Sequence, residues 1–429
     1  MNISELQLKN FRCFKESRFQ FHRQFNLLIG ENASGKSSLL EGLAVGVGSW
    51  FLGIRGYDSK TIDKSHVRVA PIAHLDTKQL ERQYPVSVSC SGMVMSKRIS
   101  WDRELTGVDG STTRTGAKSI KELAVDAERR VRRGEAVDLP LIAYYGTKRL
   151  WVNPKEVEKA MDSGSKQGGE RLDGYFFSTD DRIHVKGILA WLRKQRYQSL
   201  ESSRDSAAFT AVKRAIVACS EGCRTAEYSV KEETLMLEFA GRESLPFHLL
   251  SDGQRSMIAM LADIALKAVT LNPHLGDLAP STTSGVVLID EIDMHLHPRW
   301  QRKVVKSLKN AFPKLQFFAT THSPQVIRET PHDEIMVLKP DGSWDRPPQS
   351  IGLDSSEVLR YIMDTESING DVAQELEKLD QLLAEAEFEK ARELISSIRS
   401  KYGELSRTSG AEAYIARMEL LADQEADTP

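Results

Sequence analysis

The chain has 429 residues, with 58 Lys and Arg against 60 Asp and Glu, so its formal net charge is -2. Hydrophobic residues make up 40% and charged residues 28%, which is typical of a globular protein and excludes a disordered or collagen-like chain. No apolar run approaches the roughly 18–20 residues that a membrane helix needs, and the first residues carry no signal-peptide pattern. We therefore expect a cytoplasmic protein of about two or three domains that does not cross a membrane.

The first part of the chain is predicted to contain strands around one apolar helix. Strands are predicted from apolar alternation or short apolar runs at 3–11, 25–29, 139–145 and in a hairpin within 85–104 that turns at Met95-Ser96. A helix is predicted from Lys36, with Leu39, Leu40, Leu43 and Val47 on one apolar side, and a charged helix over 119–133. The polar stretch 106–116 is rich in Gly, Ser and Thr and is predicted to be a loop.

The second part alternates helices with strands, which favours a mostly parallel α/β sheet. A helical insertion is expected at about 150–232, and its Gly-, Ser-, Asp- and Lys-rich stretch 152–182 is expected to be mobile. Helices are predicted at 183–198, 205–219, 254–270 and 299–311, and strands at 234–239, 285–290 and 315–320. These elements complete a domain spanning 1–350, and residues 351–429 form a separate C-terminal helical region.

Residues 30–37, with the sequence GENASGKS, match the phosphate-loop pattern G-x-x-x-x-G-K-[ST] at every fixed position. The match lies between a predicted strand and a predicted helix, where backbone N–H groups and the helix N-terminus can surround a phosphate. The pattern predicts that Lys36 reaches the β- and γ-phosphates of ATP and that Ser37 is a ligand of Mg²⁺. The residues expected to bind ATP here are Asn32, Ala33, Ser34, Gly35, Lys36, Ser37 and Ser38.

Two further segments carry polar residues directly after apolar strands. The run Val286–Ile289 is followed by Asp290 and Glu291. At the carboxyl edge of a parallel sheet these acids would lie near the phosphate loop. Asp290 is predicted to hold Mg²⁺ through water, and Glu291 to act as general base toward the attacking water. His322 follows the strand 315–320, where a lone histidine is more often just a turn residue.

The segment Leu250–Gln254, with the sequence LSDGQ, opens a helix, and the simplest interpretation of Ser251 is a helix cap. It also resembles the LSGGQ signature of ABC-type ATPases, with Asp252 where glycine is commonest. Together the four motifs resemble ABC-type ATPases of the SMC/RecF/OLD group. That resemblance implies an α/β ATPase head with a mixed, largely parallel sheet, an antiparallel β subdomain and a helical insertion.

The same resemblance implies a composite site. Ser251, Gly253 and Gln254 would close on the γ-phosphate held by a second copy, so the chain would work as a homodimer or a higher even-numbered assembly. His322 would be the switch histidine that contacts the γ-phosphate and water, and Asp293 would be the D-loop aspartate. The glutamine of the family's Q-loop is absent from 141–149, where Thr147 or Arg149 would replace it.

The sequence Met294-His295-Leu296-His297-Pro298 contains an H-x-H pair. Such a pair could bind a metal ion, but two ligands alone do not make a metal site. In the resembled group this segment is an interface loop. The segments YYGTKRLW, LSDGQRS, LIDEIDMHLHP and TTHSPQV together resemble the PtuA-type ATPase subunits of Septu antiphage systems, which also occur with some retrons.

The Septu resemblance implies an ATPase subunit that controls a separate HNH nuclease subunit, with DNA as a further candidate partner. No nuclease motif is recognised in this chain. The alternative is a DNA-binding repair ATPase of the RecF/SMC type, and an ABC transporter motor is a weaker third because the Q-loop glutamine is missing.

The end of the chain is acidic, with 14 acidic against 7 basic residues from Asp371 onward. Its apolar spacing predicts a packed helical hairpin or three-helix unit with a solvated outer face. Docking of a basic partner, or further self-assembly, is the alternative role of this surface.

Overall fold

The computed structural model describes residues 1–74, 77–149, 170–220, 222–241, 243–364 and 370–426. The chain divides into two compact units, Met1–Val358 and Leu359–Pro429. Most of the stretch 152–182 that was expected to be mobile lies outside the described residues, as does the start of the insertion at about 150. Its described end contains a short 3-10 helix, η3 (Arg171–Tyr175).

A six-stranded sheet forms the centre of the first unit, in the order β15-β14-β3-β13-β12-β8. Its strands are β3 (Phe25–Ile29), β8 (Leu141–Tyr145), β12 (Gly285–Ile289), β13 (Leu315–Thr320), β14 (Ile335–Leu338) and β15 (Trp344–Asp345). All neighbouring pairs are parallel except the edge pair β14–β15. The strands β3, β8, β12 and β13 are buried along their whole length, which is why each is mostly apolar in the sequence. The buried amides of Asn26 and Gln316 donate hydrogen bonds to backbone carbonyl groups.

An antiparallel sheet with the order β2-β1-β6-β7 lies on the other side of helix α1 (Lys36–Gly48). Its strands are β1 (Asn2–Phe11), β2 (Phe14–Gln20), β6 (Val86–Val94) and β7 (Lys97–Leu105). The predicted hairpin is confirmed, because β6 and β7 pair around Met95 and Ser96, which both have positive φ. Strand β2 was not predicted, since only three of its seven residues are buried and the rest are polar.

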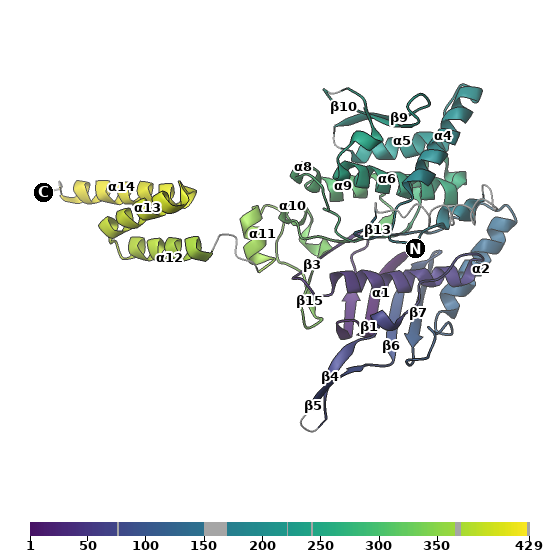
Figure 1. Cartoon of the computed structure of the whole chain (residues 1–429), viewed down its shortest axis with the longest axis horizontal. Coiled ribbons are helices and arrows are strands. Elements are labelled where there is room, and N and C mark those ends of the chain that lie inside the picture. The colour runs from purple at the N-terminus through teal and green to yellow at the C-terminus, as the bar shows by residue number, and fades with distance from the viewer. Residues whose placement is uncertain (75–76, 150–169, 221, 242, 365–369, 427–429) are drawn as a thin grey trace. The chain divides into compact units, whose positions relative to one another are not determined.

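Helix α1 packs between these two sheets (Figure 1). The sequence predicted one apolar side, but nearly every residue after Leu39 is buried, because the helix has a sheet on each side. Close approach to the antiparallel sheet depends on Gly46, where a Cβ atom would lie 2.3 Å from Cys90 Sγ. Trp101 on β7 donates a hydrogen bond to the Gly46 carbonyl at 2.9 Å. The predicted α/β architecture with a mixed, largely parallel sheet and an antiparallel β subdomain is confirmed.

Helices and a small sheet cover the remaining part of the first unit. The helices are α2 (Lys118–Arg132), α4 (Val185–Ser202), α5 (Ala207–Cys219), α6 (Asp252–Leu271), α7 (Ala279–Thr282), α8 (Pro298–Gln301), α9 (Val304–Ala311), α10 (Pro324–Ile327) and α11 (Ser355–Tyr361). The 3-10 helices besides η3 are η1 (Ser49–Gly53), η2 (Lys64–His66), η4 (Phe247–Leu249), η5 (Pro273–Leu278) and η6 (His332–Glu334). Short antiparallel sheets are formed by β4 (Val69–His74) with β5 (Thr77–Arg82), and by β9 (Cys223–Ser229), β10 (Thr234–Phe239) and β11 (Leu245–Pro246).

One helix prediction is wrong in detail. The single helix expected at 299–311 is two helices, α8 and α9, separated at Arg302-Lys303. The Lys303 N–H donates a hydrogen bond to the Trp300 carbonyl, three residues earlier, which is a tighter turn than that of an α-helix. A new helix, α9, begins after this turn. Over the described residues, no helix combines the length and apolar character needed to cross a membrane.

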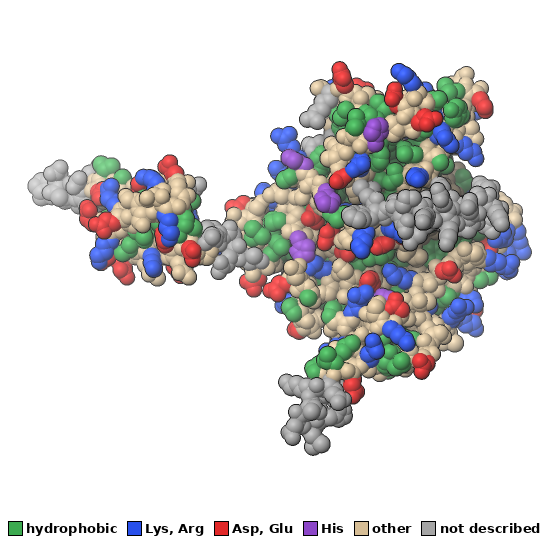
Figure 2. Space-filling model, viewed as in Figure 1, with side chains coloured by type: hydrophobic (Ala, Val, Ile, Leu, Met, Phe, Trp, Pro, Cys, Tyr) green, Lys and Arg blue, Asp and Glu red, His purple; other side chains and the backbone are tan. Residues whose placement is uncertain are grey.

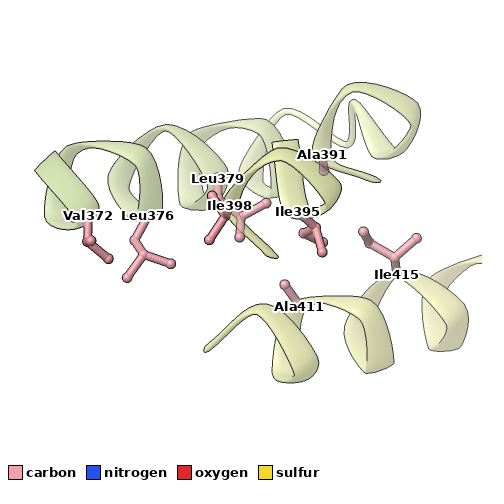
Figure 3. Packing of buried hydrophobic residues seen from close by; sticks show 8 residues of the cluster. All are labelled: Val372, Leu376, Leu379, Ala391, Ile395, Ile398, Ala411 and Ile415. Carbon is pink, nitrogen blue, oxygen red and sulfur yellow. The ribbon is translucent and has the colours of Figure 1, made fainter. Parts of the chain in front are cut away.

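The second unit contains α12 (Gly370–Ala384), α13 (Phe388–Tyr402) and α14 (Ser406–Ala426). These helices share an apolar core (Figure 3), which consists of Val372, Leu376, Leu379, Ala391, Ile395, Ile398, Ala411 and Ile415. Acidic and basic side chains are interspersed over the outer surface of this unit (Figure 2). Ion pairs join its helices, among them Arg392–Glu419 and Arg399–Glu412. Part of the acidic excess is therefore paired within the unit.

Candidate nucleotide site

The phosphate loop connects β3 to α1, and two glycines allow its shape. Gly30 has a φ of 145°, and a Cβ atom there would lie 2.3 Å from the Leu338 carbonyl oxygen. Gly35 has a φ of 97° and precedes the helix directly. Ala33 also has positive φ, so the loop takes a left-handed turn before the helix begins. The result is a loop whose N–H groups lead into the N-terminus of a buried helix, which is a favourable environment for an anion.

The residues predicted to bind ATP lie around this loop. Asn32, Ala33 and Ser37 are exposed, whereas Ser34 and Gly35 are buried and Ser38 is half-buried. The Ser34 Oγ is buried and has no hydrogen-bond partner within the described residues. An unsatisfied hydroxyl beside a glycine turn fits a loop that donates hydrogen bonds to a phosphate.

Lys36 is 8% exposed, and its ammonium group donates hydrogen bonds to the carbonyl oxygens of Gly30 at 2.8 Å and Glu31 at 2.7 Å. Burial lowers the pKa of Lys36 below its ordinary value, and the charges of Asp290 and Glu291 act in the opposite direction. A buried ammonium held by two carbonyls of its own loop is well placed to exchange them for phosphate oxygens.

The acid pair lies at the carboxyl end of β12, next to the phosphate loop. Asp290 is 8% exposed, and its Oδ1 accepts hydrogen bonds from Ser37 Oγ at 3.3 Å and from Thr320 Oγ1 at 2.6 Å. Thr320 Oγ1 in turn accepts a hydrogen bond from the Glu291 N–H at 2.7 Å. The hydroxyl of Ser37 and the carboxylate of Asp290 are thus adjacent oxygen donors, the kind of ligand that Mg²⁺ prefers.

The sequence did not single out Thr320, although it is the last residue of β13 and begins the polar segment Thr320–Ser323. Strand β13 lies between β3 and β12, so its carboxyl end opens between the phosphate loop and the acid pair. The sequence alone does not place Thr320 beside the acid pair, because this depends on the order of the strands in the sheet. Glu291 has a φ of 50°, so the backbone turns sharply at the residue after Asp290.

Arg149 is one of the two residues that the sequence offered in place of the Q-loop glutamine. It is 2% exposed, and its guanidinium donates to the carbonyl oxygens of Asp290 at 2.7 Å and Glu291 at 3.0 Å. It therefore contacts the backbone that carries the acid pair, through two carbonyl groups. Thr147, the other candidate, is exposed.

Arg149 also contacts the signature helix. Its Nε donates to Ser256 Oγ at 2.8 Å, and Ser256 belongs to α6. Burial lowers the pKa of Arg149 to about 10, opposed by the charges of Asp290, Glu291 and Asp293. The side chain is still a cation at neutral pH, and it joins α6 to the acid pair. Sequence spacing gives no signal for this contact, because its partners lie more than 100 positions away.

The signature residues open helix α6. Ser251 is the N-cap, and its side chain and that of Gln254 form a reciprocal capping box. Gly253 is buried, and a Cβ atom there would lie 2.0 Å from the His295 carbonyl oxygen. Asp252 is exposed and forms an ion pair with Arg255. Glycine is therefore required at 253 but not at 252, which explains why this signature tolerates an aspartate.

A cavity of about 510 Å³ lies in front of the signature. Its polar lining includes Ser251, Gln254, His295, His297 and Arg299. Of the described residues that line it, none belongs to the phosphate loop. His297 caps α8 through its Nδ1, and no group of three His, Cys, Asp or Glu side chains among the described residues could hold a metal ion.

His322 is exposed and follows β13 at the same sheet edge. Its two neighbours are fixed, because Thr321 donates to the Asp293 carboxylate and Ser323 caps α10. The imidazole therefore projects from a rigid turn located between the phosphate-loop strand and the acid-pair strand in the sheet order. The Asp293 side chain is bonded to Thr321 within the same chain.

Comparison with known proteins agrees with this geometry. A family model described as "AAA domain" matches residues 5–221, which is half of the chain. The chain belongs to the AAA domain family. A second AAA domain model, whose description also names an AbiEii toxin of a Type IV TA system, matches residues 166–328. As predicted, this AAA domain protein is an ATPase.

Similar proteins align with most of this AAA domain protein. The Retron Ec83 probable ATPase of Escherichia coli is 25% identical over 85% of this chain and 76% of its own length. The Septu protein PtuA of Bacillus mycoides (strain KBAB4) is 28% identical over 78% of this chain but only 40% of its own length. The crystal structure of an SMC head bound to the C-winged helix domain of ScpA aligns with 81% of this chain and 97% of its own, at a TM-score of 0.46 and 16% identity. The predicted resemblance to retron and Septu ATPases is confirmed.

Proposed function

We propose that this chain hydrolyses ATP with Mg²⁺ as a homodimer or a higher even-numbered assembly, and that the nucleotide cycle controls a separate HNH nuclease subunit in antiphage defence. The similarity to retron ATPases and to a Septu protein over most of the chain supports this biological setting. DNA would be the nuclease's substrate, and in this proposal the cutting residues belong to the other subunit.

The proposal of a composite site depends mainly on the exposure of the signature. The Ser251 cap faces a polar cavity to which the chain's own described phosphate-loop residues do not contribute. A γ-phosphate that reaches Ser251 would then come from another copy of the chain. Backbone N–H groups at the start of α6, a helix of 20 residues, would complement its negative charge.

Within one copy, the chain's residues divide the work of hydrolysis. Lys36 would move from its two loop carbonyls to the β- and γ-phosphates. Ser37 and Asp290 would hold Mg²⁺, which would offset the negative charge of the phosphates. Glu291 would accept a proton from the attacking water, and His322 would donate a hydrogen bond to the γ-phosphate.

Arg149 belongs to this proposal as a positioning residue. A general base must stay within hydrogen-bond reach of the water it activates, so its backbone must be held in place. Arg149 bonds to the carbonyl oxygens of Asp290 and Glu291 and to Ser256 of α6. When a partner copy engages the start of α6, a displacement of this helix would reach the acid pair through Arg149.

The proposed cycle is tested by comparing two variants of the full chain with the unmutated chain. We expect Lys36→Ala to lose nucleotide binding and Glu291→Gln to bind ATP, hydrolyse it at least ~100-fold more slowly and accumulate as a dimer. ATP turnover and light scattering after size exclusion measure both effects. Equal turnover by Glu291→Gln and the unmutated chain would remove Glu291 from the role of general base.

The composite site has its own test. Ser251→Arg places bulk and charge at the mouth of the signature cavity, so we expect it to prevent ATP-dependent dimerisation in the Glu291→Gln background. Lys231→Ala, at an exposed residue of the β9–β10 turn, serves as a surface control. Unchanged dimerisation by Ser251→Arg would refute a site shared between copies.

The nuclease partner is tested by co-expression with an HNH subunit encoded beside this chain's gene, followed by affinity capture. We expect a stable complex and degradation of DNA that requires both subunits. The same capture with residues 365–429 deleted asks whether the C-terminal helices dock the partner. Absence of any complex with the full-length chain would contradict the proposed control of a nuclease.

A further inference from the structure

A buried arginine lies on β7, at the edge of the antiparallel sheet. Arg103 is 1% exposed, although arginine is rarely buried without an acidic partner. Its Nε donates a hydrogen bond to the Thr113 carbonyl at 2.8 Å. Its Nη1 is buried and has no hydrogen-bond partner among the described residues. A charged donor left unpaired in this way is costly, so a binding partner for it is expected.

The charges around Arg103 do not supply that partner. Asp102 and Glu104 flank it in sequence, but alternation along the strand directs them to the other face of the sheet. The Asp102 carboxylate lies against Gly116, where a Cβ atom would be 2.1 Å from its Oδ2. Burial lowers the pKa of Arg103 to about 10, and the positive charge of Arg114 is the second cause.

Arg103 and Arg114 line a cavity of about 390 Å³. All its other lining residues are serine or threonine, from segments 59–61 and 111–115, and no carboxylate is among them. The wall of this cavity is held by hydrogen bonds, because Thr112 Oγ1 accepts from the Ile62 N–H at 2.9 Å and donates to the Ile62 carbonyl at 3.1 Å. The Glu104 N–H also donates to Thr113 Oγ1 at 3.0 Å. The cavity is thus built by fixed segments.

This cavity is separate from the nucleotide site. Trp101 lies on the same face of β7 as Arg103 and bonds to the Gly46 carbonyl near the end of α1. Lys36 is at the start of that helix, ten positions earlier, so about 15 Å of helix separates the two residues. None of the residues that line the Arg103 cavity belongs to the phosphate loop, the acid pair or the signature.

We propose that the Arg103 cavity binds a phosphate group, with Arg103 Nη1 and the Arg114 guanidinium as charged donors and the lining hydroxyls other than that of Thr112 as neutral donors. Guanidinium–phosphate hydrogen bonds are among the strongest in proteins, and the absence of carboxylates from the lining removes the usual repulsion of an anion. The phosphate group belongs either to a small phosphorylated molecule or to a nucleic-acid backbone.

The first test measures thermal stability of the full chain carrying Lys36→Ala, which removes the response of the phosphate loop. We expect inorganic phosphate at tens of millimolar to raise the melting temperature of the first unit by about 1–3 °C over chloride at equal ionic strength. Adding Arg103→Met should abolish this rise. The matched control Arg98→Met removes an exposed arginine from the same strand and should keep it.

A variant at the exposed Arg114 guards against misfolding of Arg103→Met. Arg114→Ala should fold normally and weaken the phosphate response at least twofold. An equal temperature rise in Arg103→Met and the Lys36→Ala parent would overturn the proposal. So would no rise in that parent.

The source of the phosphate group is tested with a fluorescent single-stranded oligonucleotide of about 20 nucleotides in anisotropy titrations. If the backbone of a nucleic acid is the ligand, Arg103→Met should weaken binding about tenfold and reduce the salt slope by about one. If the ligand is small, oligonucleotide affinity should not change while inorganic phosphate still stabilises the parent. Either result supports the phosphate site and identifies its source.

Discussion

Thr320 and Arg149 hold the acid pair in place, although neither was predicted to contact it. Thr320 bridges the side chain of Asp290 and the backbone of Glu291 with one hydroxyl, and Arg149 bonds to the backbone carbonyls of both residues. Both are buried, so water cannot replace their hydrogen bonds when they are removed. At the scale of single residues, the proposed role of Glu291 as general base thus depends on side chains from two other strand ends.

Arg149→Met is expected to reduce ATP turnover at least tenfold and to leave ATP affinity within about threefold. The substitution keeps the apolar stem but leaves two buried carbonyl oxygens without their charged donor, at roughly 2–4 kcal/mol of stability. Steady-state turnover, nucleotide binding and the melting temperature measure these effects. Arg133→Met, at an exposed residue, is the control. Full turnover by Arg149→Met would end the positioning role.

Arg149→Lys separates positioning from charge. A lysine ammonium cannot match the planar guanidinium, which reaches four acceptors at once. We therefore expect turnover to recover only partly compared with Arg149→Met. Complete recovery would mean that the positive charge alone is needed.

Thr320→Val keeps the shape of the side chain and removes its hydroxyl. The Glu291 N–H then loses its acceptor and Asp290 loses a donor. We expect ATP turnover to fall about tenfold, since one lost hydrogen bond to a charged group is worth about 1.5–3 kcal/mol. We also expect low concentrations of Mg²⁺ to activate the variant less than they activate the unmutated chain. A magnesium titration of ATP turnover measures both. Kinetics equal to those of the unmutated chain would contradict this role for Thr320.

At the scale of elements, helix α6 carries both the signature residues and a contact with Arg149. Its first residues form the signature, and its Ser256 bonds to Arg149 one turn further along. Its start is pressed against the loop after the acid pair, where Gly253 meets the His295 carbonyl. The position of α6 and the conformation of that loop are therefore linked by direct contact.

Gly253→Ala is expected to separate α6 from this loop. A Cβ atom 2.0 Å from a carbonyl oxygen cannot be accommodated without a shift, so we expect a loss of about 1–3 kcal/mol in stability and loss of ATP-dependent dimerisation. Asp252→Ala, at the exposed neighbouring position, should change the stability by no more than about 0.5 kcal/mol and should keep ATP-dependent dimerisation. Chemical denaturation and light scattering compare the two. Similar behaviour of both variants would show that the contact is not needed.

At the scale of the whole molecule, the chain has two compact units with separate apolar cores. Among the described residues, the buried core of the C-terminal unit consists of side chains from α12, α13 and α14. Because cooperative unfolding follows the shared core, we expect two thermal transitions.

Ala411→Asp tests this separation. It introduces a carboxylate into the core of the C-terminal unit, where the Ala411 side chain is 6% exposed. We expect the free energy of unfolding of that unit to fall by several kcal/mol, so that its thermal transition moves to lower temperature. The transition of the first unit and ATP turnover should not change. Ala413→Asp, which lies on the exposed face of the same helix, is the matched control. A single transition that shifts as a whole in Ala411→Asp would show that the two units unfold together.

Prediction from sequence succeeded where one residue pattern has one structural outcome. The strands at 25–29, 285–290 and 315–320 were predicted because strands buried on both faces are mostly apolar. Strand β2 was missed because one of its faces is in contact with solvent and its sequence is mostly polar. Helix α1 was expected to have one apolar side because the sheet on its second side could not be inferred from local spacing.

The amino-acid sequence by itself determined the phosphate loop, the acid pair and the helix cap at Ser251, because each depends on neighbouring residues and on local backbone geometry. Only the tertiary structure decided the role of Arg149, the bridge made by Thr320 and the unpaired donor of Arg103. Those contacts join segments up to about 140 positions apart, and their energies depend on burial and on hydrogen-bond partners that only the packing of strands and helices creates.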